Sequence, residues 1–86
     1  MPFTREGAER LAVALRQVDR HVEQPVTVWR WNDALGTECR ATLYGWRGRG
    51  EDRLGLIVSR RWRDAAGRLT DVVEWVPATM IRARGE

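Results

Sequence analysis

The sequence predicts a mainly β, α+β protein in which one N-terminal amphipathic helix packs on a five-stranded small β-barrel. Three observations support this prediction. Apolar residues recur at three- and four-residue steps near the N-terminus, short alternating segments follow from Val26 onward, and turn sequences separate those segments. With 86 residues the chain has room for a single domain (1–86) with one modest core. Any function must therefore lie on one small surface.

We expect the helix over residues 4–23. Thr4 is a suitable N-cap, and Glu6 lies near the positive end of the helix dipole. Pro25 should end the segment, because it disfavours helical geometry at Gln24. The predicted apolar stripe comprises Ala8, Leu11, Ala12, Leu15, Val18 and Val22. One amphipathic helix cannot bury such a stripe alone, so it must pack on the strands that come after it in the chain.

Residues 26–84 are expected to form the barrel, because closing a small sheet removes its exposed edges. The turn sequences are NDALGT, the glycine-rich loop RGRGEDR, DAAG, and ATM after Pro77. The predicted strands lie at Val26–Trp31, Glu38–Trp46, within Arg53–Asp64, at Arg68–Val76 and at Ile81–Ala83.

Two segments carry a resemblance to known small barrels. WVPATMIRA resembles the end of a Src-homology-3-like barrel, where an apolar residue and a proline start one tight turn before the last strand. VWRWNDALGTECRATLYGW is similar in rhythm to the start of a Tudor-like barrel. The resemblance begins at Val26 and implies a five-stranded barrel. It does not imply binding of proline motifs, because Met80 stands where those binders have an aromatic residue and their acidic loop is missing.

The turn Asp64-Ala65-Ala66-Gly67 predicts the register of the last hairpin, with a left-handed glycine and Asp64 opposite Arg68. In that register Arg61 falls opposite Asp71, which predicts a cross-strand ion pair. The face expected inside the barrel holds Leu56, Val58, Val72 and Val76. The face expected under the helix holds Ile57, Val73 and Trp75.

The formal charge of +3 arises from fifteen arginines and no lysine. A GC-rich coding sequence, as in some bacteria and their phages, explains the preference for arginine as well as a function does. The position of the arginines is more informative. Residues 46–63 hold six arginines against Glu51 and Asp52, and a polyanion responds to such a local excess.

Nucleic-acid binding by a non-enzymatic module is the first functional hypothesis. A two-stranded ribbon fits the major groove, arginines neutralise phosphates, and tryptophan stacks on unpaired bases. The candidate surface joins the last hairpin to the glycine-rich loop, provided that the two lie side by side. Its residues are Arg60, Trp62, Arg63, Arg68, Trp46, Arg47, Arg49 and Arg53. The alternative is that these arginines only solubilise the surface.

A protein partner is the second hypothesis, because Trp and Arg are enriched at binding hot spots and the chain has five tryptophans. Trp29 and Trp31 share one face of a strand. Burial under the helix is favoured for this pair, since tryptophan is well buried on average. Otherwise Trp29 and Trp31 project towards a partner, together with Trp62. A phage-encoded protein that captures a host factor would have these features.

Nothing in the sequence predicts catalysis, a cofactor or a metal site. His21 suits the C-terminal end of the helix, and Cys39 is expected as a buried, inert thiol. A metal site needs more Cys or His ligands than these two. The charged N-terminus and the single cysteine are typical of a cytoplasmic protein, and Leu54–Val58, the longest apolar run, is too short to span a membrane.

Overall fold

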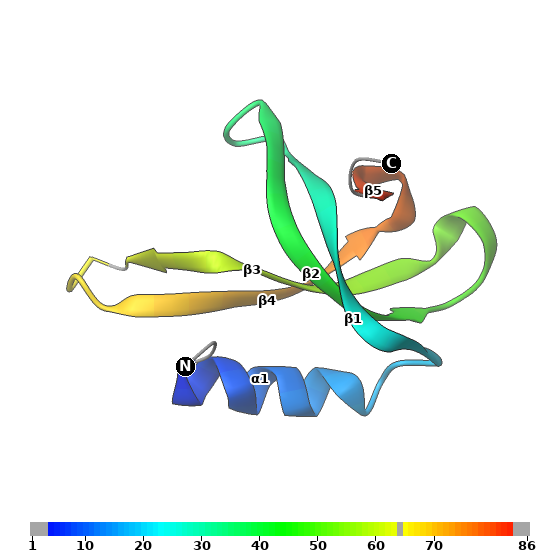
Figure 1. Cartoon of the computed structure of the whole chain (residues 1–86), viewed down its shortest axis with the longest axis horizontal. Coiled ribbons are helices and arrows are strands. Elements are labelled where there is room, and N and C mark those ends of the chain that lie inside the picture. Colours follow the sequence, from blue (N-terminus) through cyan, green and yellow to red (C-terminus); the bar gives the residue numbers. More distant parts are fainter. Residues whose placement is uncertain (1–3, 64, 84–86) are drawn as a thin grey trace.

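The computed structural model describes residues 4–63 and 65–83 of the chain, without the side chains of residues 60–63, 69 and 70 (Figure 1). These described residues form one helix, five strands and two short 3-10 turns. The elements are α1 (Arg5–Leu15), β1 (Arg20–Asn32), β2 (Thr37–Arg47), η1 (Gly50–Asp52), β3 (Leu54–Arg63), β4 (Leu69–Pro77), η2 (Ala78–Met80) and β5 (Ile81–Ala83). The predicted mainly β, α+β class is confirmed, as are the tight turn after Pro77 and the short last strand.

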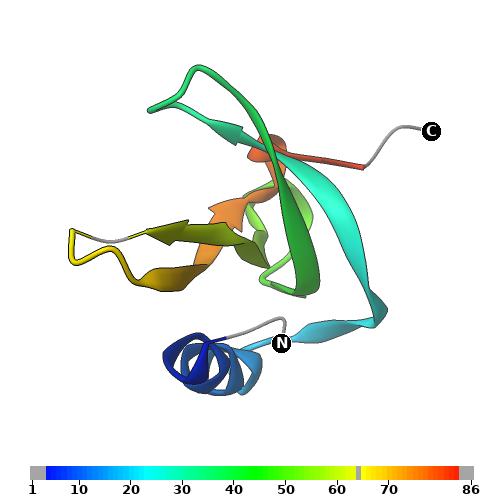
Figure 2. The same ribbon diagram turned by 60° about the vertical axis from the view of Figure 1, so that its left-hand side comes forward.

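All strand pairs are antiparallel, and the sheet has the order β4-β3-β2-β1-β5. The β1–β2 hairpin rises across the β3–β4 hairpin, and α1 lies along the opposite face of β3 and β4 (Figures 1 and 2). The two hairpins therefore leave the centre of the molecule in different directions.

The helix is shorter than predicted. Thr4 is the N-cap, as expected, and its hydroxyl accepts a hydrogen bond from Gly7 N at 3.0 Å. However, α1 ends at Leu15, and β1 already begins at Arg20. Pro25 lies inside β1, where the pairing with β2 shifts between His21 and Val26. Such an irregularity can accommodate a proline, because the ladder is interrupted there and does not need its missing N–H.

The buried side of α1 also differs from the predicted stripe. Gly7 and Leu11 are buried, whereas Ala8 and Ala12 are exposed. Ala14, Leu15 and Val18 pack beside Leu11. The helix is rotated towards its glycine because Gly7 has no side chain and can approach β4 closely.

The register of the β3–β4 hairpin changes along its length. Near the turn, Arg63 pairs with Leu69, which is the predicted register, and Gly67 has the expected positive φ of 81°. The pairing shifts between Ser59 and Trp62, so that residues 60 and 61 of β3 lie opposite residue 71 of β4. This is a β-bulge, in which one strand holds one extra residue.

The bulge reverses the predicted faces of β3. A register shift of one residue moves side chains to the other face of the sheet, and here it changes the predicted faces of the β3 residues that precede the bulge. Ile57, expected under the helix, is fully buried in the first core cluster, while Leu56 and Val58 pack under α1. The faces of β4 are as predicted, because Val76 lies in the first cluster and Val73 and Trp75 lie under the helix.

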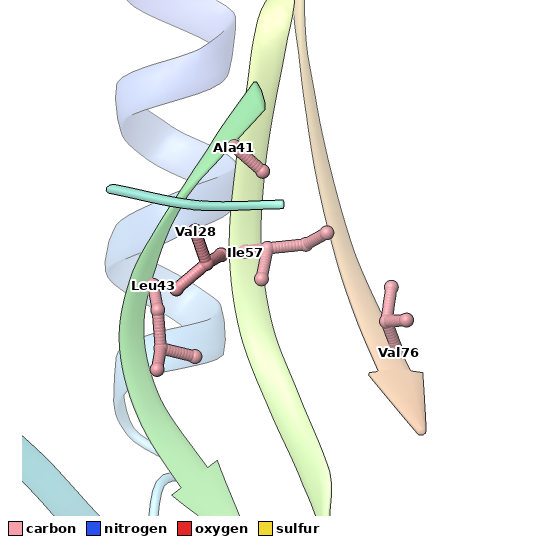
Figure 3. Packing of buried hydrophobic residues seen from close by; sticks show 5 residues of the cluster. All are labelled: Val28, Ala41, Leu43, Ile57 and Val76. Carbon is pink, nitrogen blue, oxygen red and sulfur yellow. The ribbon is translucent and has the colours of Figure 1, made fainter. Parts of the chain in front are cut away.

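The sheet thus has a core on each face. The first cluster joins residues from β1, β2, β3 and β4 whose side chains converge (Figure 3). Its buried members are Val28, Ala41, Leu43, Ile57 and Val76. The second cluster, centred on Leu11, Leu56 and Val58, fixes the helix to the sheet. Truncating one of these large aliphatic side chains to alanine would cost about 2–5 kcal/mol.

Candidate functional site

The β3–β4 hairpin continues beyond the rest of the sheet as a separate two-stranded ribbon. Pairing between β2 and β3 stops at Ala41 and Ser59, whereas β3 and β4 run on together to Arg63 and Leu69. We call residues 60–70 the basic ribbon. They carry four arginines against one aspartate, an excess of three that equals the net charge of the whole chain. All other residues together sum to a formal charge of zero.

Four predicted nucleic-acid-binding residues belong to this basic ribbon. Arg60, Trp62 and Arg63 are in β3, and their side chains lie outside the described part of the structure. Arg68 is exposed just before β4. The predicted ion pair of Arg61 with Asp71 also depends on a side chain outside the described part.

The glycine-rich loop lies at the other end of β3. Ten residues separate it from the turn of the basic ribbon, a distance of about 30 Å for an extended strand. Figure 1 shows the loop and that turn at opposite sides of the molecule. The condition for one combined surface is therefore not met, and Trp46, Arg47, Arg49 and Arg53 form a surface of their own.

Arginines of this loop contact groups of the chain itself. The Arg53 guanidinium lies 4.5 Å from the centre of the Trp46 ring and donates a hydrogen bond to the Gly50 carbonyl at 2.9 Å. Arg47 donates to Gln17 Oε1 at 3.1 Å, and Arg49 is exposed. Trp46 also packs against the first core cluster. Arg47, Arg53 and Trp46 therefore have structural roles in holding the loop.

The β1–β2 hairpin also projects from the sheet, and we call its outer part, residues 29–40, the tryptophan ribbon. Trp29 is half-buried, and the guanidinium of Arg40 on the opposite strand lies 5.8 Å from its ring centre. Trp31 is 40% exposed and donates its indole N–H to Asp33 at 2.6 Å. Leu35, at the turn, is 54% exposed.

The predicted burial of Trp29 and Trp31 under the helix is wrong. The helix ends at Leu15 and packs on β3 and β4, so it does not cover this part of β1. Among the tryptophans whose side chains are described, Trp75 packs beneath α1. The position of Trp75 was predicted from the register of the last hairpin, whereas that of Trp29 and Trp31 was inferred from a helix longer than the one observed.

A groove of about 720 Å³ lies between the tryptophan ribbon and the neighbouring part of β3 and β4. One wall is formed by the tryptophan ribbon and the floor by β3 and β4. Arg30 of β1 and Glu74 of β4 form an ion pair across it, with Nη2 and Oε1 3.0 Å apart. The described residues that line the groove are Trp29, Arg30, Asn32, Glu38, Cys39, Arg40, Ser59, Val72 and Glu74. The sequence contains no signal for this groove, because it results from the bulge in β3.

A second ion pair fixes the outer side of the tryptophan ribbon. Arg82 of β5 donates from Nε and Nη2 to the two carboxylate oxygens of Glu38, at 3.0 and 2.6 Å. These hydrogen bonds, together with the positive charge of Arg82, hold the pKa of Glu38 below its usual range. The pKa of Arg82 is raised by the same contact.

The two residues considered for catalysis do not occupy the predicted positions. His21 is exposed in β1 opposite Gly45, and not at the end of the helix. Cys39 is half-buried at the groove, and not fully enclosed in the core. Among the described residues, no three His, Cys, Asp or Glu side chains gather as they would around a metal ion.

These observations define the class of protein: a small, mainly β, α+β domain with a basic ribbon, a tryptophan ribbon and a groove beside the tryptophan ribbon. No helix in the described part of the chain is long and apolar enough to cross a membrane. No family model matches the sequence, and neither the curated proteins nor the solved structures contain a significant match.

Proposed function

We propose that this protein is a non-enzymatic module that contacts nucleic acid through the basic ribbon. The observation behind this proposal is the concentration of charge: the excess of positive charge in the chain equals that of residues 60–70, on a ribbon that extends beyond the sheet. A concentrated patch attracts a polyanion more strongly than the same charge spread over the surface.

The shape of the basic ribbon supports the same proposal. The major groove of duplex DNA is about 12 Å wide and admits a two-stranded β-ribbon. Arginines on such a ribbon neutralise phosphates and release counterions, and Trp62 provides a flat ring for an unpaired base. The glycine-rich loop contributes less to this proposal, because Arg47 and Arg53 are engaged within the chain.

Fluorescence anisotropy of labelled duplex and single-stranded oligonucleotides, measured over a salt series, tests this function. The variant Arg60→Gln/Arg63→Gln is compared with Arg49→Gln, which removes an exposed arginine at the far end of β3. Binding should weaken steeply with salt, and each lost phosphate contact should reduce the log–log slope by about 1. Arg49→Gln should change neither affinity nor slope. Absence of binding at low salt would reject the proposal.

We further propose that the five strands form a Src-homology-3-like or Tudor-like barrel. The strand order β4-β3-β2-β1-β5 and the single 3-10 turn between β4 and β5 support this assignment. The fold assignment alone does not identify a ligand, because small barrels serve both nucleic-acid and protein recognition.

Protein recognition through the tryptophan ribbon is the second candidate function. The exposure of Trp31 and Leu35 on a projecting hairpin favours it, because Trp anchors many interfaces and large apolar groups gain from burial in a partner. Asp33 and Glu38 offset Arg30 and Arg40 on the same ribbon, so it has no excess of positive charge to attract phosphates. A loss of partner binding in Trp31→Ala would support this function.

A further inference from the structure

Along residues 38–40, one edge of β2 has no strand beside it in the described part of the chain. Among the described residues, β2 pairs with β1 up to Thr37, but its pairing with β3 ends at Ala41. The main-chain groups of residues 38–40 on that side therefore face the groove instead of a neighbouring strand. All three residues line the groove.

The bulge in β3 is the reason for this open edge. Beyond Ser59, β3 follows β4 in a shifted register and no longer continues along β2. A bulge bends the strand that contains it and increases its twist, so the two ribbons diverge. Figures 1 and 2 both show the β1–β2 and β3–β4 hairpins pointing in different directions. The space that a straight β3 would occupy is the groove.

The chemistry of the groove fits a peptide better than a nucleic acid. Among the described side chains that line it, Arg30 and Arg40 are matched by Glu38 and Glu74, so these residues give no excess of positive charge for a phosphate. An exposed strand edge presents N–H and C=O groups at a spacing that the main chain of an extended peptide matches. Val72 and Ser59 contribute an apolar group and a hydroxyl to the floor of the groove.

We propose that an extended peptide of a partner protein binds in this groove and pairs with residues 38–40 of β2, which adds a strand to the sheet. This inference rests on the second candidate function, protein recognition, and specifies the form of the partner and its position. Main-chain hydrogen bonds supply affinity in this mode, and contacts to alternate side chains supply specificity.

The probe is a linear peptide selected from a random display library on the immobilised full chain, then synthesised. The first measurement is amide hydrogen exchange of the protein with and without this peptide. Pairing at the free edge should slow exchange within residues 38–40. The second measurement is affinity after N-methylation of single peptide bonds in the probe, which removes one donor at a time without altering the protein. At least one N-methylated probe should bind about tenfold more weakly or worse.

Two matched protein variants complete the test. Val72→Arg places a long charged side chain on the floor of the groove and should weaken binding by about tenfold or more. Val13→Arg adds the same side chain on the exposed surface of α1, where Val13 is 58% exposed, and should leave binding unchanged. The N-methylated probes keep the inference testable even if Val72→Arg fails to fold.

Several outcomes would overturn the inference. One is that the library yields no binding peptide. Another is that neither Val72→Arg nor N-methylation changes the affinity of the selected peptide. If Trp31→Ala nevertheless abolishes binding of that peptide, protein recognition stands and only the position in the groove is wrong. A third is that a single-stranded oligonucleotide displaces the peptide and slows amide hydrogen exchange within residues 38–40. This result would assign the groove to nucleic acid.

Discussion

Asp71 and Thr4 connect the beginning of the helix to the fourth strand. The Asp71 carboxylate, only 2% exposed, accepts hydrogen bonds from the Thr4 backbone N–H at 2.7 Å and from its hydroxyl at 3.1 Å. The same hydroxyl accepts from Gly7 N and caps the helix. A buried carboxylate is stable only when it is hydrogen-bonded, so this contact determines where α1 starts and where it is attached to the sheet.

Substitution of Gly7 tests this attachment. A Cβ atom at position 7 would press against the Asp71 carboxylate and lie 2.8 Å from Asp71 Cβ. Gly7→Ala should therefore destabilise the protein in urea unfolding, although helix propensity alone favours alanine by about 1 kcal/mol. The control is Ala12→Gly on the exposed side of the helix, which should lower the free energy of unfolding by about the same 1 kcal/mol difference in helix propensity. A stabilising Gly7→Ala would contradict the close contact.

The Glu38–Arg82 pair predicts a specific dependence of stability on pH. Because the hydrogen bonds from Arg82 lower the pKa of Glu38 from its ordinary value of 4.5, the folded state favours the ionised carboxylate. The stabilising contribution is present above pH 4.5 and disappears as the pH falls through the lowered pKa. Glu38→Gln should thus be less stable than the unaltered protein at neutral pH and equal to it in strong acid.

Urea unfolding of Glu38→Gln, Arg82→Gln and the double variant at several pH values measures this effect. If the two residues act as one pair, the double variant should be little worse than either single variant at neutral pH. Additive losses would show that the two side chains contribute independently.

Tyr44 is the only tyrosine, so its ionisation can be followed directly by tyrosinate absorbance. Partial burial of Tyr44 beside the helix, and secondly the negative charge of Asp71, raise its pKa above the ordinary value of 10.0. The neutral phenol is favoured in the folded state, so its contribution to stability is complete below pH 10 and is lost as the pH rises through the raised pKa. The midpoint should fall when urea unfolds the chain. Equal midpoints in both states would exclude the effect.

The stack of Arg53 on Trp46 predicts a role in stability and not in binding. Arg53→Ala removes this contact and the hydrogen bond to Gly50, and should cost about 0.5–2 kcal/mol in urea unfolding. Arg53→Lys keeps the charge but loses the planar group, and should recover only part of that loss. Anisotropy with oligonucleotides should give the affinity of the unaltered protein for both variants. A loss of affinity without a loss of stability would return the loop to the nucleic-acid surface.

The elements that sequence patterns predicted well are those that depend on neighbouring residues. Thr4 caps a helix because its hydroxyl reaches the N–H of Gly7, three residues away. Gly67 closes the last hairpin because it adopts a positive φ without strain. Pro77 and the three residues after it form the tight turn before β5. Each of these features needs only a few consecutive residues.

The errors have a long-range cause. The apolar periodicity of the helix continued through Val18 and Val22, but β2 offers partners to this segment, and Asp19 N already donates to the Trp46 carbonyl at 2.9 Å. Strand pairing therefore replaced the last predicted turns of the helix. Trp29 and Trp31 were expected under that longer helix, and its early end leaves Trp31 exposed.

By itself, the sequence determined the mainly β class, the helix start, the number of strands and the concentration of charge near the last hairpin, because local periodicity, turn chemistry and composition encode them. Only the tertiary structure decided where the helix ends, which face of β3 is buried, and that the two basic segments lie apart. The physical reason is that each feature depends on pairing between distant segments. Pairing with β2 ends the helix early, the length of β3 separates the two basic segments, and the bulge after Ser59 reverses the buried face of β3.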